Sequence, residues 1–179
     1  MGIDKSWIDY KGHMKMACYN VLFKKAGEDA LSKMGLGFTY AMERGFTSYA
    51  AEVHICCVRE LHLGDEVTAT FHLPDHNEKR IRFFQELRHV EGWLAATAEQ
   101  LSLHIDMSGP RVVPYPSDIL PTLEQVQAAH AVLGTPVRAG KRIAVARGRP
   151  CIPDLEKANP QTRRPWLGNS RSRAFAAWR

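Results

Sequence analysis

The chain has 179 residues, of which 45% are hydrophobic, and this suits one globular domain with a sizeable core rather than two full domains. No apolar stretch approaches the roughly 20 residues that span a bilayer, and residues 1–7 lack the apolar region of a signal peptide, so we expect a soluble, cytoplasmic protein. The net charge of +5 is unevenly spread: residues 134–179 contain 11 basic and two acidic residues, a net +9, which leaves −4 on residues 1–133.

The first informative segment is residues 9–19, in which Asp9 and a Gly12-His13 turn precede an amphipathic helix. The start of a helix offers unpaired backbone N–H groups that can stabilise the negative charge on a carbonyl oxygen under attack. Asp9 could then attack or act as a base, and the helix dipole favours its ionised form. A second interpretation stays open, in which Asp9 only caps a turn ahead of the helix.

The helix itself is predicted over residues 16–34. Apolar residues recur there at intervals of three and four, which indicates one buried face, and Gly35 and Gly37 supply a stop. Tyr19 falls on the buried face, so we expect a core aromatic whose hydroxyl finds a partner, although a place near a bound substrate is also open.

Four strands are predicted after a loop through Arg44-Gly45, because β-branched and aromatic residues alternate between short turns. Such short connections favour antiparallel hairpins, so the class is α+β, with an antiparallel sheet packed on one long helix. The predicted strands cover residues 47–58, 66–73, 79–90 and 94–105.

A further short helix is predicted near residues 122–133, with Thr122 as its cap and Gly134 as its end. Prolines and basic residues dominate beyond it. We therefore place one domain at residues 1–147 and a basic, poorly ordered tail at residues 148–179. The tail could bind phosphates or an anionic membrane, but it has no nucleic-acid motif and few aromatics, so we expect neither nucleic acid nor membrane as a partner.

These segments resemble the hot dog fold acyl-CoA thioesterases of the 4-hydroxybenzoyl-CoA thioesterase-like group, and within it bacterial thioesterase-like proteins of carnitine and betaine metabolism. The resemblance covers roughly residues 5–145. The residues that carry it are Trp7-Ile8-Asp9-Tyr10, Gly12-His13-Met14, Tyr19, Gly35-Leu36-Gly37, Glu52-Val53-His54-Ile55, Arg59-Glu60-Leu61, Gly64-Asp65, Lys79-Arg80, Gly92-Trp93-Leu94-Ala95-Ala96-Thr97 and Leu103-His104-Ile105-Asp106.

The resemblance implies a long central helix wrapped by a curved antiparallel sheet, with homodimers or dimers of dimers joined sheet edge to sheet edge. It also implies that a small or medium acyl-CoA is hydrolysed to the free acid and coenzyme A without a further cofactor. By position, Asp9 is the nucleophile or general base, and the backbone N–H near Met16 polarises the thioester. Two alternatives stay open: an acyl-CoA-binding protein without hydrolysis, and a hot dog hydratase or dehydratase.

Gly12 and His13 are further substrate-binding candidates. Gly12 lacks a Cβ and permits a tight turn and the close approach of a thioester, while His13 could contact the substrate, hold Asp9 or simply bond backbone. Lys11 and Lys15 stand where many relatives have Asn, and their ammonium groups could meet the phosphates of coenzyme A.

Glu52 and Glu60 are weaker candidates, because they share a face if the first long strand has no bulge, although solvent-facing positions explain them too. His104 and Asp106 alternate on one face of the last strand, where we interpret them as strand-end polar residues. The eight histidines and four cysteines show no His-x-x-x-His or Cys-x-x-Cys spacing, so the sequence predicts no metal. The absence of a Gly-x-Ser-x-Gly elbow argues against a serine thioesterase.

Overall fold

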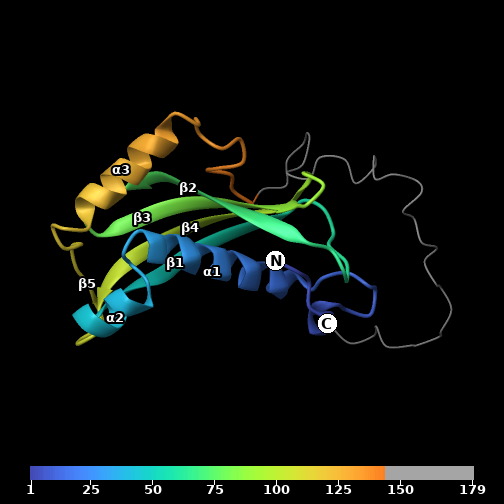
Figure 1. Ribbon diagram of the computed structural model, residues 1–179, viewed down its shortest axis with the longest axis horizontal. Helices are drawn as coiled ribbons and strands as arrows, with labels where there is room; N and C mark the ends of the chain where they lie inside the picture. The colour runs from blue at the N-terminus through green and yellow to red at the C-terminus, as the bar shows by residue number, and fades with distance from the viewer. Residues whose placement is uncertain (144–179) are drawn as a thin grey trace, which may run out of the picture.

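The computed structural model describes residues 1–143. The predicted boundary at residue 147 and the basic tail at 148–179 lie outside the described residues. Within them, a long helix packs on one face of an antiparallel sheet, and shorter helices lie at its ends and margin (Figure 1).

Helix α1 (Met16–Lys33) confirms the predicted long helix. The side chains that it buries recur at intervals of three and four along one face. They belong to Tyr19, Leu22, Phe23, Gly27 and Leu31. Gly35 adopts a left-handed conformation with φ 78° just past the C-cap Met34, as expected for a glycine stop.

The sheet has the strand order β1-β4-β3-β2, and every pairing is antiparallel. A two-residue strand, β5, pairs with the end of β4. The strand bounds are β1 (Phe46–Cys57), β2 (Val67–His76), β3 (Arg80–His89), β4 (Leu94–Asp106) and β5 (Arg111–Val112). The four predicted strands are therefore confirmed, with their ends displaced by at most three residues.

The core lies between α1 and the inner face of the sheet. The pairing register aligns Phe83 of β3 with Gln100 of β4, and Leu87 with Ala96, and α1 packs on this face. One buried cluster surrounds the start of α1 and a second its end. Gln85 is a polar member of the inner face, and its amide donates to the Phe23 carbonyl at 3.2 Å. The start of α1 is therefore held against a packed sheet.

Helix α3 (Leu120–Ala131) lies along β2, at one margin of the sheet (Figure 1). It begins before the predicted Thr122: its N-cap is Ile119, and Pro121 occupies the first turn, where a missing N–H has no cost. The predicted cap was therefore wrong. The His130 ring accepts the Leu73 N–H at 3.0 Å, so α3 covers part of the β2 edge where Pro74 and a register shift interrupt the strand.

Helix α2 (Phe38–Arg44) was missed, since residues 38–44 were expected to form a loop. Seven residues are too few for a periodic pattern, and the helix is held by tertiary contacts. Tyr40 is buried, and Arg44 forms a bidentate pair with Asp118 at 2.7 and 3.0 Å. No helix in residues 1–143 is long and apolar enough to cross a membrane.

Candidate active site

The loop ahead of α1 closes on itself through backbone hydrogen bonds. The Asp9 N–H donates to the His13 carbonyl at 2.9 Å, and the Gly12 N–H donates to the Asp9 carbonyl at 3.0 Å. The Lys15 N–H donates to the Trp7 carbonyl at 2.8 Å. Asp9 is therefore presented by a compact turn that is fastened directly to the start of the helix.

The Asp9 carboxylate is partly buried, and one of its oxygens, Oδ1, accepts two backbone N–H groups. These come from Lys11 at 2.8 Å and His13 at 3.3 Å. Burial by itself would raise the pKa of Asp9, but the two backbone donors and the nearby His13 and Lys11 lower it overall. The carboxylate is thus held ionised, as predicted. It also caps the turn ahead of the helix, as in the second interpretation of Asp9, while the N-cap of α1 itself is Lys15.

Gly12 has φ 85°, a left-handed conformation that a side chain would disfavour, and a Cβ built there would meet no atom within 4 Å. The turn itself therefore requires this glycine. The predicted turn role is confirmed, while close approach of a substrate stays a prediction.

The start of α1 is open. Lys15 forms no side-chain cap, and Met16, the first helical residue, has 77% of its surface exposed. The first N–H groups of a helix have no acceptor within the helix, and they lie at its positive end. This start can therefore stabilise an oxyanion, as the sequence predicts for Met16.

Tyr19 is buried with 4% of its surface exposed, which confirms the predicted core aromatic. Its hydroxyl accepts the Leu61 N–H at 3.2 Å and donates to the Arg59 carbonyl at 3.4 Å. Burial raises the pKa of Tyr19 to about 12. The residue fastens the segment after β1 to the first turn of α1.

Glu60 lies in that segment, beyond the end of β1, and not on a strand face shared with Glu52. The predicted shared face is therefore wrong, because β1 ends at Cys57; the bulge that β1 does have, between Ala50 and Glu52, lies ahead of both residues. The structure instead brings Glu60 to His13, with Nδ1 and Oε1 3.3 Å apart. Glu52 is exposed on β1 and takes no part in this group.

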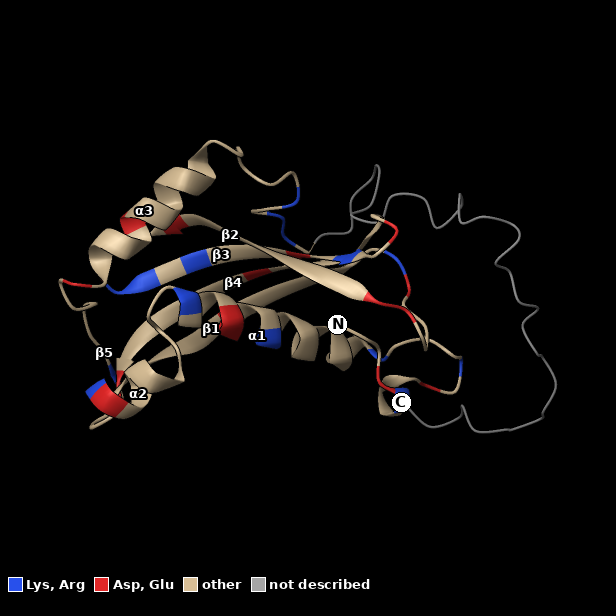
Figure 2. Ribbon diagram, viewed as in Figure 1, with Lys and Arg blue, Asp and Glu red and all other residues tan. Residues whose placement is uncertain are grey.

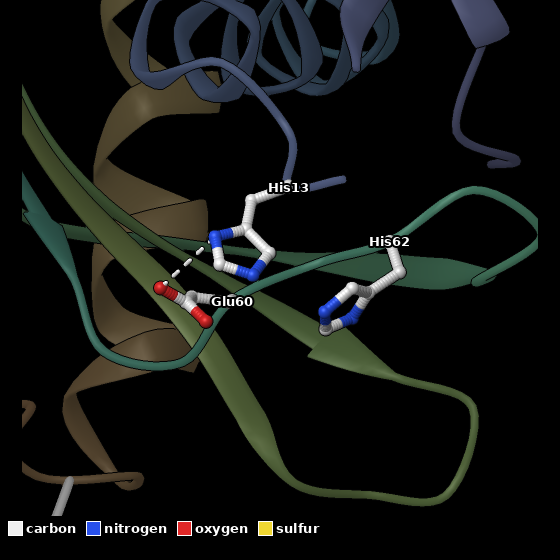
Figure 3. A group of neighbouring side chains, drawn as sticks. All are labelled: His13, Glu60 and His62. Atoms are coloured by element: carbon white, nitrogen blue, oxygen red, sulfur yellow. Dashed lines mark ion pairs between the residues drawn. The ribbon is translucent and has the colours of Figure 1, made fainter. Parts of the chain in front are cut away.

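His62 is a third member that sequence reasoning missed. Its ring meets the His13 ring edge-on, with centroids 5.2 Å apart, and Figure 3 shows His13, Glu60 and His62 pointing toward one another. Their ligand atoms all lie within 4.8 Å of one another. The two histidines are 49 positions apart in the sequence, so no local spacing could have predicted their contact. They meet because the Met14 N–H donates to the Leu61 carbonyl.

The two lysine candidates differ. Lys15 Nζ donates to the Ser6 carbonyl at 2.9 Å, whereas Lys11 is exposed, with Nζ 5.6 Å from the centre of the Tyr10 ring. Figure 2 shows basic and acidic residues interspersed along this N-terminal loop. Lys11 is therefore the better placed of the two to meet an anionic substrate.

The two polar residues at the end of β4 have separate environments. His104 is fully buried: Nε2 pairs with the Tyr40 hydroxyl at 2.8 Å, and Nδ1 lies 3.0 Å from the Val113 carbonyl. The strand-end interpretation was therefore wrong for His104, because β5 and α2 cover it. Asp106 instead accepts from Ser108 and Arg111.

A groove of about 620 Å³ runs beside the second half of α1, between β2 and α3. Its lining includes Ala26, Ala30, Phe71, Val126 and His130. Neither Asp9 nor His13 lines it, so this groove is separate from the candidate site at the start of α1.

The chain was compared with curated proteins. It is 34% identical over 146 residues to an L-carnitine dehydrogenase/betainyl-CoA thioesterase of Rhizobium meliloti, which covers 81% of this chain and 29% of that protein. It is 29% identical over 140 residues to a betainyl-CoA thioesterase of Pseudomonas aeruginosa, covering 78% and 88% respectively. The chain thus spans less than a third of the Rhizobium protein.

Solved structures share the fold. A hypothetical protein from Staphylococcus aureus, solved in complex with CoA, has a TM-score of 0.76 at 25% identity and covers 82% of this chain and 92% of its own. A DHNA-CoA thioesterase from the same species has a TM-score of 0.69 at 17% identity, covering 75% and 93%. The hot dog architecture predicted from sequence is therefore confirmed.

The family comparison covers the whole site, from the N-terminal loop through the segment after β1. The model of the thioesterase-like superfamily matches residues 3–123, which include Asp9, Tyr19, Glu60 and the complete sheet. The chain belongs to the thioesterase-like superfamily.

Proposed function

We propose that this protein is a thioesterase that hydrolyses a small or medium acyl-CoA to the free acid and coenzyme A, with Asp9 as nucleophile or general base. The observation that carries the proposal is the ionised Asp9 carboxylate, held by two backbone N–H groups in a loop fastened to the open start of α1. Membership of the thioesterase-like superfamily supports the same reaction.

The reaction divides between two groups. The N–H groups at the start of α1, near Met16, stabilise the negative charge that develops on the thioester oxygen. Asp9 either attacks the thioester carbon itself or removes a proton from an attacking water. Its second oxygen, Oδ2, accepts neither of the two backbone donors that bind Oδ1, and it is the atom to which this proposal assigns the attack or the proton transfer.

The substrate is proposed from the chain and from its relatives together. Gly12 keeps the turn free of a side chain, and Lys11 is an exposed cation for the coenzyme A phosphates. His13 and Tyr19 flank the acyl end in this proposal. Betainyl-CoA is the first acyl-CoA to test, because two of the relatives are named for it.

The proposed assembly is a homodimer, or a dimer of such dimers, formed through β1. Strand β1 pairs with β4 on one side, and within residues 1–143 its other edge has no partner, whereas α3 covers part of the β2 edge. Tyr49 and Val53 are exposed on β1. Pairing of two β1 edges would remove this unpaired edge and enclose the substrate between subunits.

The proposal places the reaction in the cytoplasm, where acyl-CoA is available, and assigns no cofactor beyond the coenzyme A moiety of the substrate. Nucleic acid and membrane have no part in it.

The decisive experiment measures coenzyme A release across a panel of acyl-CoAs that includes betainyl-CoA. We expect Asp9→Asn to lower kcat/KM by about 10²–10⁴-fold, because Asn keeps the Oδ1 acceptor and the turn but cannot attack or take a proton. Asp4→Asn is the matched control, since Asp4 Oδ1 also accepts a backbone N–H two residues on, from Ser6. Wild-type rates in Asp9→Asn would contradict the assigned role.

The same panel separates the alternatives. Tight coenzyme A binding without release of free acid would indicate a binding protein that does not hydrolyse the thioester. This alternative is considered because Lys11 and Lys15 stand where many relatives have Asn. Intact acyl-CoA with altered unsaturation would select a hydratase or dehydratase. Rapid quenching followed by mass spectrometry distinguishes the two roles of Asp9, because only the nucleophile forms an acyl adduct on its carboxylate.

A further inference from the structure

Two segments of the chain converge beside the Asp9 turn and present three metal-ligating side chains. His13 comes from the loop ahead of α1, and Glu60 and His62 come from the segment after β1 (Figure 3). Two imidazoles and one carboxylate form a donor set that proteins use for zinc. We propose that His13, Glu60 and His62 form a zinc-binding site.

The distances between these side chains suit the ion. Zinc bonds of about 2.0–2.2 Å in a tetrahedral arrangement place neighbouring ligand atoms about 3.3–3.5 Å apart. His13 Nδ1 and Glu60 Oε1 are 3.3 Å apart, and no pair in the group exceeds 4.8 Å. The longer distances between ligand atoms would shorten on binding through rotation of the His62 and Glu60 side chains, which are 53% and 56% exposed.

The backbone that holds the ligands is fixed on both sides. The Met14 N–H donates to the Leu61 carbonyl at 2.8 Å, which joins the residue after His13 to the residue between the other two ligands. The buried Tyr19 hydroxyl bonds Leu61 and Arg59 as well. Binding therefore orders only side chains, and less conformational entropy is lost than at a site in a mobile loop.

The Asp65 carboxylate lies beside His62, where zinc-bound histidines commonly have an outer carboxylate. Its Oδ2 accepts the backbone N–H of His62 at 2.8 Å and lies 3.7 Å from the ring nitrogen Nδ1 of the same residue. This is beyond hydrogen-bond distance, so the proposal has the exposed His62 ring turn on binding zinc until Nδ1–H donates to Asp65 and Nε2 is the ligand. Three protein ligands leave the fourth zinc position for water or another small ligand.

This site was not anticipated from the sequence, because Glu60-x-His62 is no recognised zinc spacing and its partner His13 is distant along the chain. The proposal does not depend on thioester hydrolysis, since zinc binding is measured without substrate, and no step of the proposed reaction uses the ion.

Calorimetric titration of the full chain with Zn²⁺, after chelation and desalting, tests the site. We expect one zinc per chain, and we expect Glu60→Gln and His62→Ala each to weaken binding at least tenfold. Asp65→Asn should weaken it by about 10–100-fold through His62. The matched controls Glu66→Gln and His54→Ala change an exposed acid next to Asp65 and a β1 histidine, and should bind zinc as the wild type does.

Two further measurements keep the test decisive. Circular dichroism spectra recorded without zinc show which variants are folded, and only those are titrated. Glu60→Gln should be among them, because it preserves the side-chain volume. Co²⁺ substitution reports the ligand type, because thiolate ligands give an intense charge-transfer band that nitrogen and oxygen ligands lack. Unchanged affinity in Glu60→Gln and His62→Ala, or a thiolate spectrum, would overturn the proposal.

Discussion

At the scale of single residues, the functional side chains of this protein are held by backbone groups more than by one another. Asp9 accepts two N–H groups of its own turn, and Tyr19 accepts one from the segment after β1. A substitution that removes the acceptor atom therefore removes a backbone contact as well as a functional group.

Tyr19→Phe tests this dependence. Without the hydroxyl, the N–H of the fully buried Leu61 loses its acceptor, and an unsatisfied buried donor costs about 1–3 kcal/mol of unfolding free energy. Urea denaturation should show the loss. Tyr10→Phe, at a 93% exposed tyrosine away from the sheet, is the control and should change the unfolding free energy by less than about 0.5 kcal/mol.

The pKa of Tyr19 adds a pH signature to the same variant. Its folded value of about 12 lies above the ordinary 10.0, so the stabilisation is complete below pH 10 and is lost as pH rises toward 12. The Phe variant should lose less of its remaining stability than wild type across that window. Parallel pH profiles for the two proteins would contradict a buried, protonated Tyr19.

At the scale of secondary elements, α1 is set by its apolar periodicity, but one of its positions is not optimised for a helix. Gly27 faces the sheet, and a Cβ there would lie 3.7 Å from Gln85 and Phe83, an ordinary contact distance. The glycine is therefore accommodated by space that a methyl group can fill.

Gly27→Ala should raise the unfolding free energy by about 0.5–1 kcal/mol, the difference in helix propensity between the two residues. The melting temperature should rise accordingly. Gly37→Ala is the contrasting variant, because its Cβ would come within 2.3 Å of Ser32 Oγ. It should lower the melting temperature, and a rise in Gly37→Ala or a fall in Gly27→Ala would show that the packing differs from that described.

Helix α3 is attached to the sheet through a titratable contact. The neutral His130 ring accepts the Leu73 N–H, and burial, with a smaller effect of nearby His72, lowers the pKa of His130. A histidine with a lowered folded pKa contributes its stability fully above the ordinary pKa of 6.5, and this stability is lost as pH falls below 6.5 through the lower folded pKa.

Hydrogen exchange at the Leu73 amide should therefore show a protection factor that falls between pH 7 and pH 5. Burial lowers the pKa of His104 as well, so global stability declines in the same window, and the Leu73 amide isolates the α3 contact. His130→Ala should abolish the extra pH dependence, and His54→Ala should retain it. An unchanged Leu73 profile in His130→Ala would refute the contact as its cause.

At the scale of the whole molecule, the two margins of the sheet differ. α3 lies along β2, whereas β1 presents an edge without a partner in residues 1–143 (Figure 1). Long exposed edges are ready templates for pairing with another chain. The β1 margin is therefore the one on which we propose that the dimer forms.

Val53→Asp should weaken that dimer by about 10–100-fold, because a buried valine contributes about 1.5–3 kcal/mol and each 1.4 kcal/mol is tenfold in affinity. Sedimentation velocity over a concentration series measures the shift. Val90→Asp is the control, since Val90 is exposed in the turn after β3. Equal dissociation in both variants would exclude β1 as the interface.

Local pattern in the sequence determined the class, the long helix, the four main strands and the Asp9 turn. Periodicities of about 3.6 and two residues, and glycines such as Gly12 and Gly35, are properties of neighbours in the chain, so they can be read without the fold. The start of the helix just after Asp9 could be predicted for the same reason.

Only the tertiary structure decided which distant groups meet. The approach of Glu60 and His62 to His13 depends on the pairing of Met14 with Leu61, and the burial of His104 depends on α2, β5 and Tyr115 closing around it. The end of β1 at Cys57, which leaves Glu60 off the strand that carries Glu52, is likewise set by the pairing of β1 with β4. Long-range pairing leaves no periodic signal along the chain, so these contacts exist only once the sheet has formed.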